Sequence, residues 1–510
     1  MSETYICMAG VSPTPIGQSG GGRYRSHPAW MGGGEIRERK FESAETTRLN
    51  QAHWRDANDA AVNSWLDSQL VTIRSRATYE ARQNGIVQGV IHTFAEDVVG
   101  PDGPTLQVQS DDDQYNDALE ALWREWFAAP TTRPNISGAA ILKLWVRNLW
   151  KCGEYLALIV TDDTADGAVA MRLLPVHPRR LATPAELGGD QRVVMGIRFD
   201  RQGRPATYYI ADSTLGSANL TASLVSQPYP PDLVIHEFLI DEEEQARGIP
   251  WLNPSLQPSA DLRDYDNQVQ DAARQMADQS TLLYTTHPDA VLWSNPESVE
   301  VQRRMVRMVP PGWQPFTYQA TQPPVQYPDY RAERMRELGR PVGMPLLMVR
   351  LDASKHNYSS ARLDTQVYRR TVAGVQTWIS GSERSYGTLN RLVDELARES
   401  RFSVPELRTR PARVNYVWTW PVMPHVDPTK ESNAEAQGLE SITETLTGAV
   451  AARGRDLETH IQTIARERAM LIDAGIAPPP WMTGGRSAEA ATPAVDEEQI
   501  AEAVEEAVSE

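Results

Sequence analysis

Cysteine and histidine are scarce in this 510-residue sequence, which contains only Cys7, Cys152 and nine histidines. Two cysteines cannot build a disulfide framework, and they do not stand with histidines at the spacing of a zinc site. An H-E-x-x-H segment is also missing. We therefore expect no bound metal, no cofactor and a reducing compartment during folding.

Long apolar runs are absent as well. The longest, Tyr155 to Val160 and Met344 to Val349, are far shorter than the roughly 20 residues that span a bilayer. The N-terminus lacks a basic segment followed by an apolar one, so no signal peptide is predicted. With 41% hydrophobic and 23% charged residues, the composition predicts a globular protein of more than one structural region, with no membrane partner and folded in a cytoplasm.

The signature motifs of common enzyme classes are missing too. Only five of the 50 lysine and arginine residues are lysines, and none completes a Walker A loop, which argues against an ATPase. There is no G-x-S-x-G segment, and the glycines near position 20 do not follow a strand as a dinucleotide loop requires. The carboxylate runs 111–113 and 242–244 are more simply explained as solvated or helix-capping acids. We predict no catalytic residue.

The formal net charge is -17. Proteins that wrap nucleic acid neutralise phosphates with many cations, so this charge argues against tight wrapping, although it allows DNA to pass nearby. Arginine carries most of the positive charge. A GC-rich genome explains that preference more simply than selection for guanidinium chemistry, although arginine does suit bidentate ion pairs.

The pattern of apolar residues in the first half predicts helices and then short strands. Residues 1–40 are rich in glycine, serine and proline and predict a flexible arm. Helical spacing covers 46–83, ending at Asn84-Gly85 as at a C-cap, and then 87–97, 116–127 and 136–151. Strands are predicted over 155–161, 168–175, 193–199, 206–210 and 233–237.

The second half alternates long helices with a proline-rich β segment. An amphipathic helix covers 251–279, a β-prone region follows to about 328, and helical texture returns over 330–339. A helix of about forty residues is predicted from near Ser359. Residues 405–424 predict a strand and a turn. Residues 429–474 carry an apolar stripe of helical spacing that is interrupted at Gly454. The acidic C-terminal tail, 479–510, is expected to stay solvated. These patterns predict an α+β, predominantly helical fold.

Four segments, in this order, resemble the lambda-type portal proteins of tailed bacteriophages. A-R-G-I-P-W-L-N-P over 246–254 resembles the family's G-x-P-W-L-x-P entry into a helix. M-V-P-P-G-W and P-F over 308–316 are similar to its short strand and P-G-E turn, with Trp313 in place of the usual acid. D-A-S-K-H-N-Y-S-S-A-R over 352–362 is close to its N-Y-S-S-x-R before a long helix, and is the most specific. D-P-T-K-E over 427–431, with Gly454 and Asp456, resembles its D-P-x-K-E segment and later G-x-D.

The resemblance implies the portal fold, with wing, stem, clip and crown regions, in a dodecameric ring around a DNA channel. The implied regions are 1–40 a flexible N-terminal arm, 41–250 a mixed α/β wing, 251–279 a stem helix, 280–327 a β-containing clip, 328–345 a second stem helix, 346–360 a tunnel loop, 361–426 a long wing helix and strands, 427–478 crown helices, and 479–510 an acidic C-terminal tail.

In the tunnel loop, the resemblance implies contact with DNA by Arg350, Lys355, His356 and Asn357. For Lys355, an exposed position without a role is an equally consistent interpretation. Ser359 or Ser360 is expected to cap the following helix, and Tyr358 to pack.

In the clip, the candidates for partner contacts are Trp293, Trp313, Phe316 and Tyr318, which can equally form the clip's own small core. On the stem, the candidates for contacts between neighbouring subunits are Asp261, Arg263, Asp264 and Arg274. A closed ring needs a head-to-tail interface, where one surface of each subunit meets a different surface of the next, and opposite charges suit such a contact.

The implied function is that of a non-enzymatic portal vertex subunit, through which DNA enters and leaves the capsid. It would be assembled in the host cytoplasm and reside in the virion. Its partners would be further copies of itself, double-stranded DNA, the terminase, the major capsid protein and head-tail adaptor proteins. The alternatives are a capsid-associated hydrolase, either nuclease or protease, with a helical accessory region, and a helical scaffolding protein, which would require sustained heptads.

Overall fold

The structure is a computed structural model. It describes residues 59–133, 135–162, 169–212, 226–278, 282–285, 313–316, 326–354, 357–382, 385–421, 428–451 and 457–477, together with 48, 51, 52, 55, 57 and 479. The chain divides into two units, 1–59 and 60–510, and every element named below belongs to the second. Helices predominate there and strands are interspersed among them, which confirms the predicted α+β class.

Four helices build the first part of this unit: α1 (Val62–Gln83), α2 (Gly85–Val99), α3 (Asp113–Ala128) and α4 (Gly138–Cys152). The last three begin where a polar side chain accepts hydrogen bonds from free backbone N–H groups; these caps are Asn84, Asp112 and Ser137. Asn84 therefore follows α1, as predicted, but its side chain caps the start of α2. Of the predicted helix over 46–83, the described helical part begins at Val62.

Helix α2 lies at the centre of the main core because it is apolar on most of its circumference. Helices α1, α4 and α8 (Tyr358–Ser380) pack around it. The Phe94 ring of α2 makes edge-on contacts with three other rings, those of Trp150, Trp251 and Tyr368, at centroid distances of 5.6, 5.9 and 6.1 Å. Segments distant in the sequence therefore share one aromatic core.

The predicted strands form two antiparallel sheets. Strand β2 (Glu154–Thr161) lies between β3 (Met171–Val176) and β8 (Val234–Phe238), and Leu158 pairs with Leu174 on one side and Val234 on the other. The second sheet has the order β4 (Val193–Val194), β5 (Ile197–Phe199), β6 (Pro205–Ala211) and β7 (Ser226–Tyr229). The predicted strand over 193–199 is thus a tight hairpin, which turns at Met195 and Gly196, both with positive φ.

A further sheet joins two segments that lie about 310 residues apart in the chain. Strand β1 (Thr105–Gln109), which the sequence pattern did not predict, pairs antiparallel with β13 (Asn415–Thr419). Short 3-10 helices connect the larger elements: η2 (Pro178–Arg180), η3 (Ala185–Leu187), η5 (Pro231–Leu233), η6 (Asn253–Ser255), η7 (Arg340–Val342) and η8 (Pro405–Leu407).

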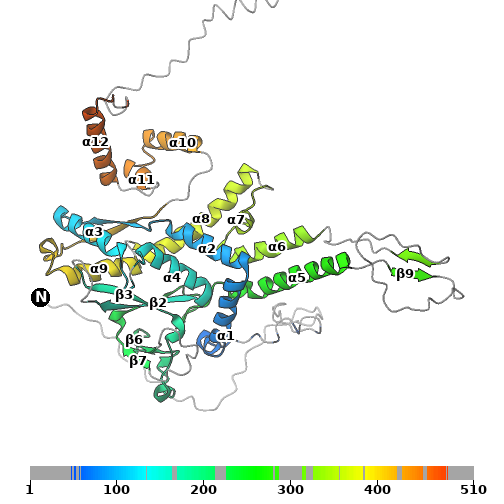
Figure 1. Cartoon of the computed structure of the whole chain (residues 1–510). Coiled ribbons are helices and arrows are strands. Elements are labelled where there is room, and N and C mark those ends of the chain that lie inside the picture. The colour runs from blue at the N-terminus through cyan, green and yellow to red at the C-terminus, as the bar shows by residue number, and fades with distance from the viewer. Residues whose placement is uncertain are drawn as a thin grey trace, which may run out of the picture. The chain divides into compact units, whose positions relative to one another are not determined.

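Beyond residue 250, helix α5 (Leu256–Asp278) and helix α6 (Tyr327–Gly339) run side by side, with the hairpin of β9 (Leu282–Thr285) and β10 (Trp313–Phe316) in the chain between them (Figure 1). The remaining elements are α7 (Leu346–Arg350), β11 (Gly381–Ser382), β12 (Ser385–Tyr386), α9 (Thr388–Ser400), α10 (Pro428–Glu440), α11 (Leu446–Ala451) and α12 (Leu457–Asp473).

Three local expectations were wrong. The helix of about forty residues is two helices, because α8 ends at Gly381, where φ is 89°, and α9 starts after Gly387. The α8 cap is Asn357, whose side chain accepts from Ser360 N at 2.8 Å, and not Ser359 or Ser360. The expected loop over 346–360 begins with the short helix α7. Among the described residues, no helix is both long and apolar enough to cross a membrane.

Candidate functional site

The α5–α6 pair is fixed by an aromatic and ionic contact. The Tyr265 ring lies against those of Tyr327 and Tyr330, with centroids 5.9 and 4.9 Å away. Next to it, Asp266 accepts a hydrogen bond from the Tyr327 hydroxyl at 2.8 Å and lies 3.3 Å from Arg331 Nε. These contacts fix how α5 and α6 are aligned along each other. The chain therefore runs out along α5 and returns along α6 at a defined position.

The four charged residues predicted on the first stem helix have different surroundings. Arg263 forms an ion pair with the buried Glu80 of α1, and its guanidinium lies 5.5 Å from the Tyr79 ring. Arg263 thus holds α5 to α1 within one chain. The other three are exposed: Asp261 accepts from Gln257, Asp264 lies 3.8 Å from Arg263, and Arg274 pairs with Asp271.

The predicted tunnel segment joins α7 to α8. Arg350 ends α7 and lies 3.3 Å from Asp352. Leu351 follows with φ 53° and an exposed side chain, an unusual combination for a leucine. Asn357 caps α8. Lys355 and His356 lie outside the described residues.

The predicted clip contacts are placed only in part. Trp313 and Phe316 are the first and last residues of β10, whose backbone pairs with β9 in the register Trp313 to Thr285 and Phe316 to Leu282. The side chains of these two residues, and the whole of Trp293 and Tyr318, lie outside what the structure describes.

A buried ionic cluster lies at the start of β2, and sequence reasoning missed it. Glu154 is fully buried and receives the Arg74 and Arg247 guanidinium groups, each at 2.6 Å, and the His236 ring at 3.1 Å. The two arginines hold the pKa of Glu154 well below its usual value, against the effect of burial. A glutamate in an otherwise apolar strand was the available signal, because carboxylates are almost never fully buried without a partner.

The same cluster explains the first family-like segment, 246–254. Gly248 N donates to Glu154 at 2.9 Å, and a Cβ added at Gly248 would lie 2.1 Å from the Gly153 carbonyl oxygen. Only glycine therefore allows the two backbones to approach so closely. Next along the chain, Trp251 N and Leu252 N donate to carbonyls at the end of α4. These contacts fix the position from which α5 starts.

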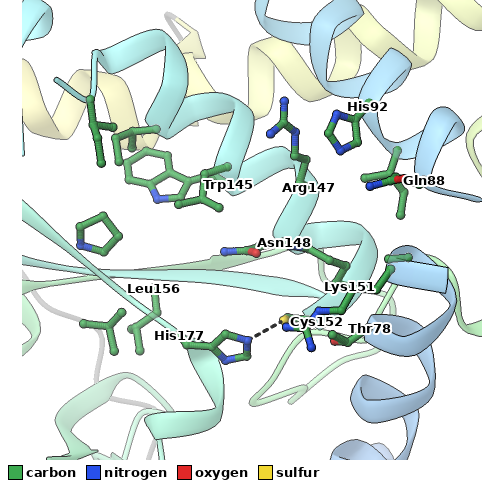
Figure 2. A pocket seen from close by; sticks show the side chains of 18 of the residues that line it. Thr78, Gln88, His92, Trp145, Arg147, Asn148, Lys151, Cys152, Leu156 and His177 are labelled. Atoms are coloured by element: carbon green, nitrogen blue, oxygen red, sulfur yellow. Dashed lines mark hydrogen bonds between the residues drawn. The ribbon is translucent and has the colours of Figure 1, made fainter. Parts of the chain in front are cut away.

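A pocket of about 420 Å³ lies between α1, α2, α4 and the end of β3. Cys152 and His177 face each other in it, with Sγ and Nε2 3.9 Å apart (Figure 2). Arg179 N donates to His177 Nδ1, so the neutral ring carries its proton on Nε2 and cannot take one from the thiol. Burial raises the pKa of Cys152. The pair is therefore not an activated nucleophile.

His177 keeps contact with solvent. Partial desolvation of its ring, with the nearby Arg179 and Arg74 guanidinium groups, nevertheless lowers the pKa of His177 to about 4. At neutral pH the ring is uncharged, so it does not stabilise a thiolate as an imidazolium would. Among the described residues, no group of three or more His, Cys, Asp and Glu side chains is arranged to hold a metal ion.

Comparison with known proteins places these elements in context. Residues 47–376 match the family described as "Phage portal protein, lambda family", a range that runs from the segment before α1 to most of α8. The chain is 21% identical over 449 residues, covering 82% of this chain and 84% of the relative, to a probable portal protein of the Halomonas phage phiHAP-1.

Similar solved structures include a chain in the neck of an empty gene transfer agent particle computed with C6 symmetry. It has 14% identity and a TM-score of 0.42, covering 79% of this chain and 94% of that one. An HK97 family phage portal protein from Corynebacterium diphtheriae has 12% identity and a TM-score of 0.28, covering 73% and 97%. With TM-scores below 0.5, neither likeness carries an argument about function.

Proposed function

Because this chain belongs to the lambda family of phage portal proteins, we propose that its copies join head to tail into a dodecameric ring at one vertex of a phage capsid. The ring surrounds a channel for double-stranded DNA, which enters during packaging and leaves during ejection. The observation that carries the proposal is the family match over 47–376, because it includes the α5–α6 pair and the α7–α8 segment together. The role is mechanical, and the chain has no catalytic activity of its own.

The exposed charges of α5 support a head-to-tail interface. Asp264 and Arg274 are 65% and 73% exposed, so most of their surface remains available to a neighbouring subunit. Asp261 is exposed on the same helix. Such an interface brings different surfaces together, and opposite charges on them fix its register.

The net charge supports a channel that does not clamp DNA. A charge of -17 per copy, repeated around a ring, repels phosphates, whereas many arginine contacts would release counterions and bind the duplex tightly. Arg350 is already paired with Asp352. In the proposed ring, residues 346–360 form the tunnel loop. Its cations Lys355 and His356, with Asn357 next to them, contact the DNA backbone transiently.

The regions implied by the family resemblance also suggest protein partners. The clip, with Trp293, Trp313, Phe316 and Tyr318 as its candidate contacts, docks the terminase during packaging and head-tail adaptor proteins afterwards. The ring also contacts the major capsid protein. The assembled ring is a virion component, formed in the host cytoplasm.

The direct test is negative-stain electron microscopy of the purified chain, with native mass spectrometry of the same sample. We expect rings with an axial hole wide enough for a duplex, and a mass of about twelve subunits. A compact monomer under all conditions tried, or a ring too narrow for DNA, contradicts the proposal. A monomer that cleaves DNA or protein favours the hydrolase instead.

The stem interface is tested by Arg274→Glu, with Arg204→Glu as the matched control. Both arginines are similarly exposed, at 73% and 74%, and each pairs with an aspartate close in sequence. We expect Arg274→Glu to raise the protein concentration at which rings form by about tenfold or more, because like charges then meet at every interface. Rings that form equally well in both variants, measured by mass photometry, would remove the stem contact.

A further inference from the structure

The pocket shown in Figure 2 is lined by four arginine and lysine side chains from three different parts of the chain. Arg82 lies in the last turn of α1, Arg147 and Lys151 belong to the second half of α4, and Arg133 precedes α4. No aspartate or glutamate is among the residues that line this pocket. The lining therefore carries positive charge and includes no acidic side chain.

Most of this charge is not neutralised elsewhere. Arg82, Arg133 and Lys151 have no carboxylate within ion-pair distance among the described residues. Arg147 lies 3.6 Å from Glu96, but Glu96 binds Lys143 more closely, at 2.5 Å. In addition, Arg147 Nε is buried and lacks a hydrogen-bond partner within the part of the chain that the structure describes. A donor left in this state costs free energy unless a ligand accepts from it.

The titration of nearby groups is consistent with an excess of positive charge. Burial lowers the pKa of Lys151, and so do Arg147 and Arg82. Desolvation, Arg147 and Lys151 likewise lower the pKa of His92, against the opposing effect of Glu96. Cations that lie close together make each other's charged form less favourable, and together they create a positive local potential that attracts an anion.

We propose that this pocket binds the phosphate group of a small phosphate-bearing molecule. Guanidinium groups match phosphate oxygens in a bidentate geometry, and a lysine adds a point charge, so the lining contains the two side-chain types best suited to this anion. The lining also includes apolar side chains, among them Ile91, Leu144 and Leu156, which can contact an uncharged part of the ligand. The volume of about 420 Å³ is in the range of small-molecule sites.

The DNA backbone is the other possible source of phosphate, and the size of the pocket favours the smaller molecule. Protein–DNA contacts bury on the order of 1,000 Å² of protein surface. Three of the four cations, Arg82, Arg147 and Lys151, lie close enough for Arg82 and Arg147 to lower the pKa of Lys151. This local group of charges suits one phosphate group better than a row of phosphates along a strand. The assignment does not depend on the proposed DNA channel, so either can fail without the other.

The test is isothermal titration calorimetry on the full-length protein, in the assembly that it forms, in phosphate-free buffer at constant ionic strength. The ligands are inorganic phosphate, deoxyadenosine monophosphate and a short single-stranded oligonucleotide. Lys151→Gln and Arg147→Gln are compared with Arg124→Gln, which removes an exposed cation of α3 that does not line the pocket. Melting temperatures verify that each variant is folded.

We expect the wild type and Arg124→Gln to bind phosphate or the monophosphate alike, and Lys151→Gln and Arg147→Gln to bind them about tenfold more weakly or worse. If Arg147→Gln unfolds, Lys151→Gln alone still tests the proposal. This variant is expected to fold, because it removes a positive charge that Arg82 and Arg147 already make less favourable. The proposal is overturned if the wild type binds neither small ligand, if all variants bind equally, or if only the oligonucleotide binds.

Discussion

Glu154 and its partners show how strongly one buried residue can stabilise the part of the fold around β2. The carboxylate neutralises Arg74 and Arg247, whose side chains are 10% and 2% exposed, so neither guanidinium can turn to water if it is lost. We expect Glu154→Gln to lower the free energy of unfolding by about 3–5 kcal/mol, because it leaves buried cations without a counter-charge. Urea unfolding followed by circular dichroism measures the change.

The control for this variant is Glu333→Gln, which removes the carboxylate of an exposed ion pair with Arg336 on α6. Exposed pairs contribute little, so a change below about 1 kcal/mol is expected. Equal losses in the two variants would mean that the Glu154 cluster is not a principal stabilising contact.

His236 in the same cluster predicts a pH dependence. Its side chain is 2% exposed, and burial lowers its pKa in the folded state, against the effect of Glu154. Below its ordinary pKa of about 6.5, the unfolded chain therefore binds a proton that the folded chain does not, and stability falls as the pH decreases. We expect the urea midpoint to fall between about pH 7.5 and pH 5.5, and to fall less in His236→Gln. An identical fall in both proteins would exclude His236 as its source.

At the scale of elements, the break between α8 and α9 is set by glycine. Gly381 has φ 89° and ψ 171°, a conformation almost restricted to glycine, whereas Gly374 lies inside α8 with open space where a Cβ would be. We expect Gly381→Ala to lower the free energy of unfolding by about 1–3 kcal/mol, and Gly374→Ala to raise it by about 0.5–1 kcal/mol.

Thermal and urea unfolding of the two glycine variants distinguish this arrangement from one continuous helix. In a continuous helix both alanines would stabilise the protein, because each would replace a helix-interior glycine. Changes of opposite sign in the free energy of unfolding would therefore show that the chain turns at Gly381.

At the scale of the whole molecule, residues 346–360 form the segment that we propose to contact DNA inside the ring. We expect the double variant Lys355→Ala with His356→Ala to assemble rings normally, since a ring interface on the stem does not involve this loop. Fewer DNA-filled particles, or earlier loss of DNA from them, should follow because two backbone contacts are removed. Quantitative PCR of nuclease-protected DNA in particles measures both. Normal packaging and retention would remove the proposed role of this loop.

Much of the fold and the family could be predicted from the sequence because the relevant signals are local. Apolar periodicity located the helices around 87–97, 116–127 and 136–151, and the family match over 47–376 confirms the resemblance drawn from short motifs. Three of those four motifs lie inside the matched range. The strand β1 was missed because its partner, β13, lies some 300 residues along the chain, and a five-residue strand has little pattern of its own.

The sequence by itself determined most of the helices and strands, the absence of common enzyme motifs and the family, since each depends on residues within a few positions of one another. Only the tertiary structure decided which charges are paired. Glu154 meets Arg74, His236 and Arg247, which are 80, 82 and 93 positions away, and Arg263 of the expected subunit contact meets Glu80 of its own chain. Charge pairing depends on distances of a few ångströms in space, and folding brings such residues together from positions that no local pattern relates.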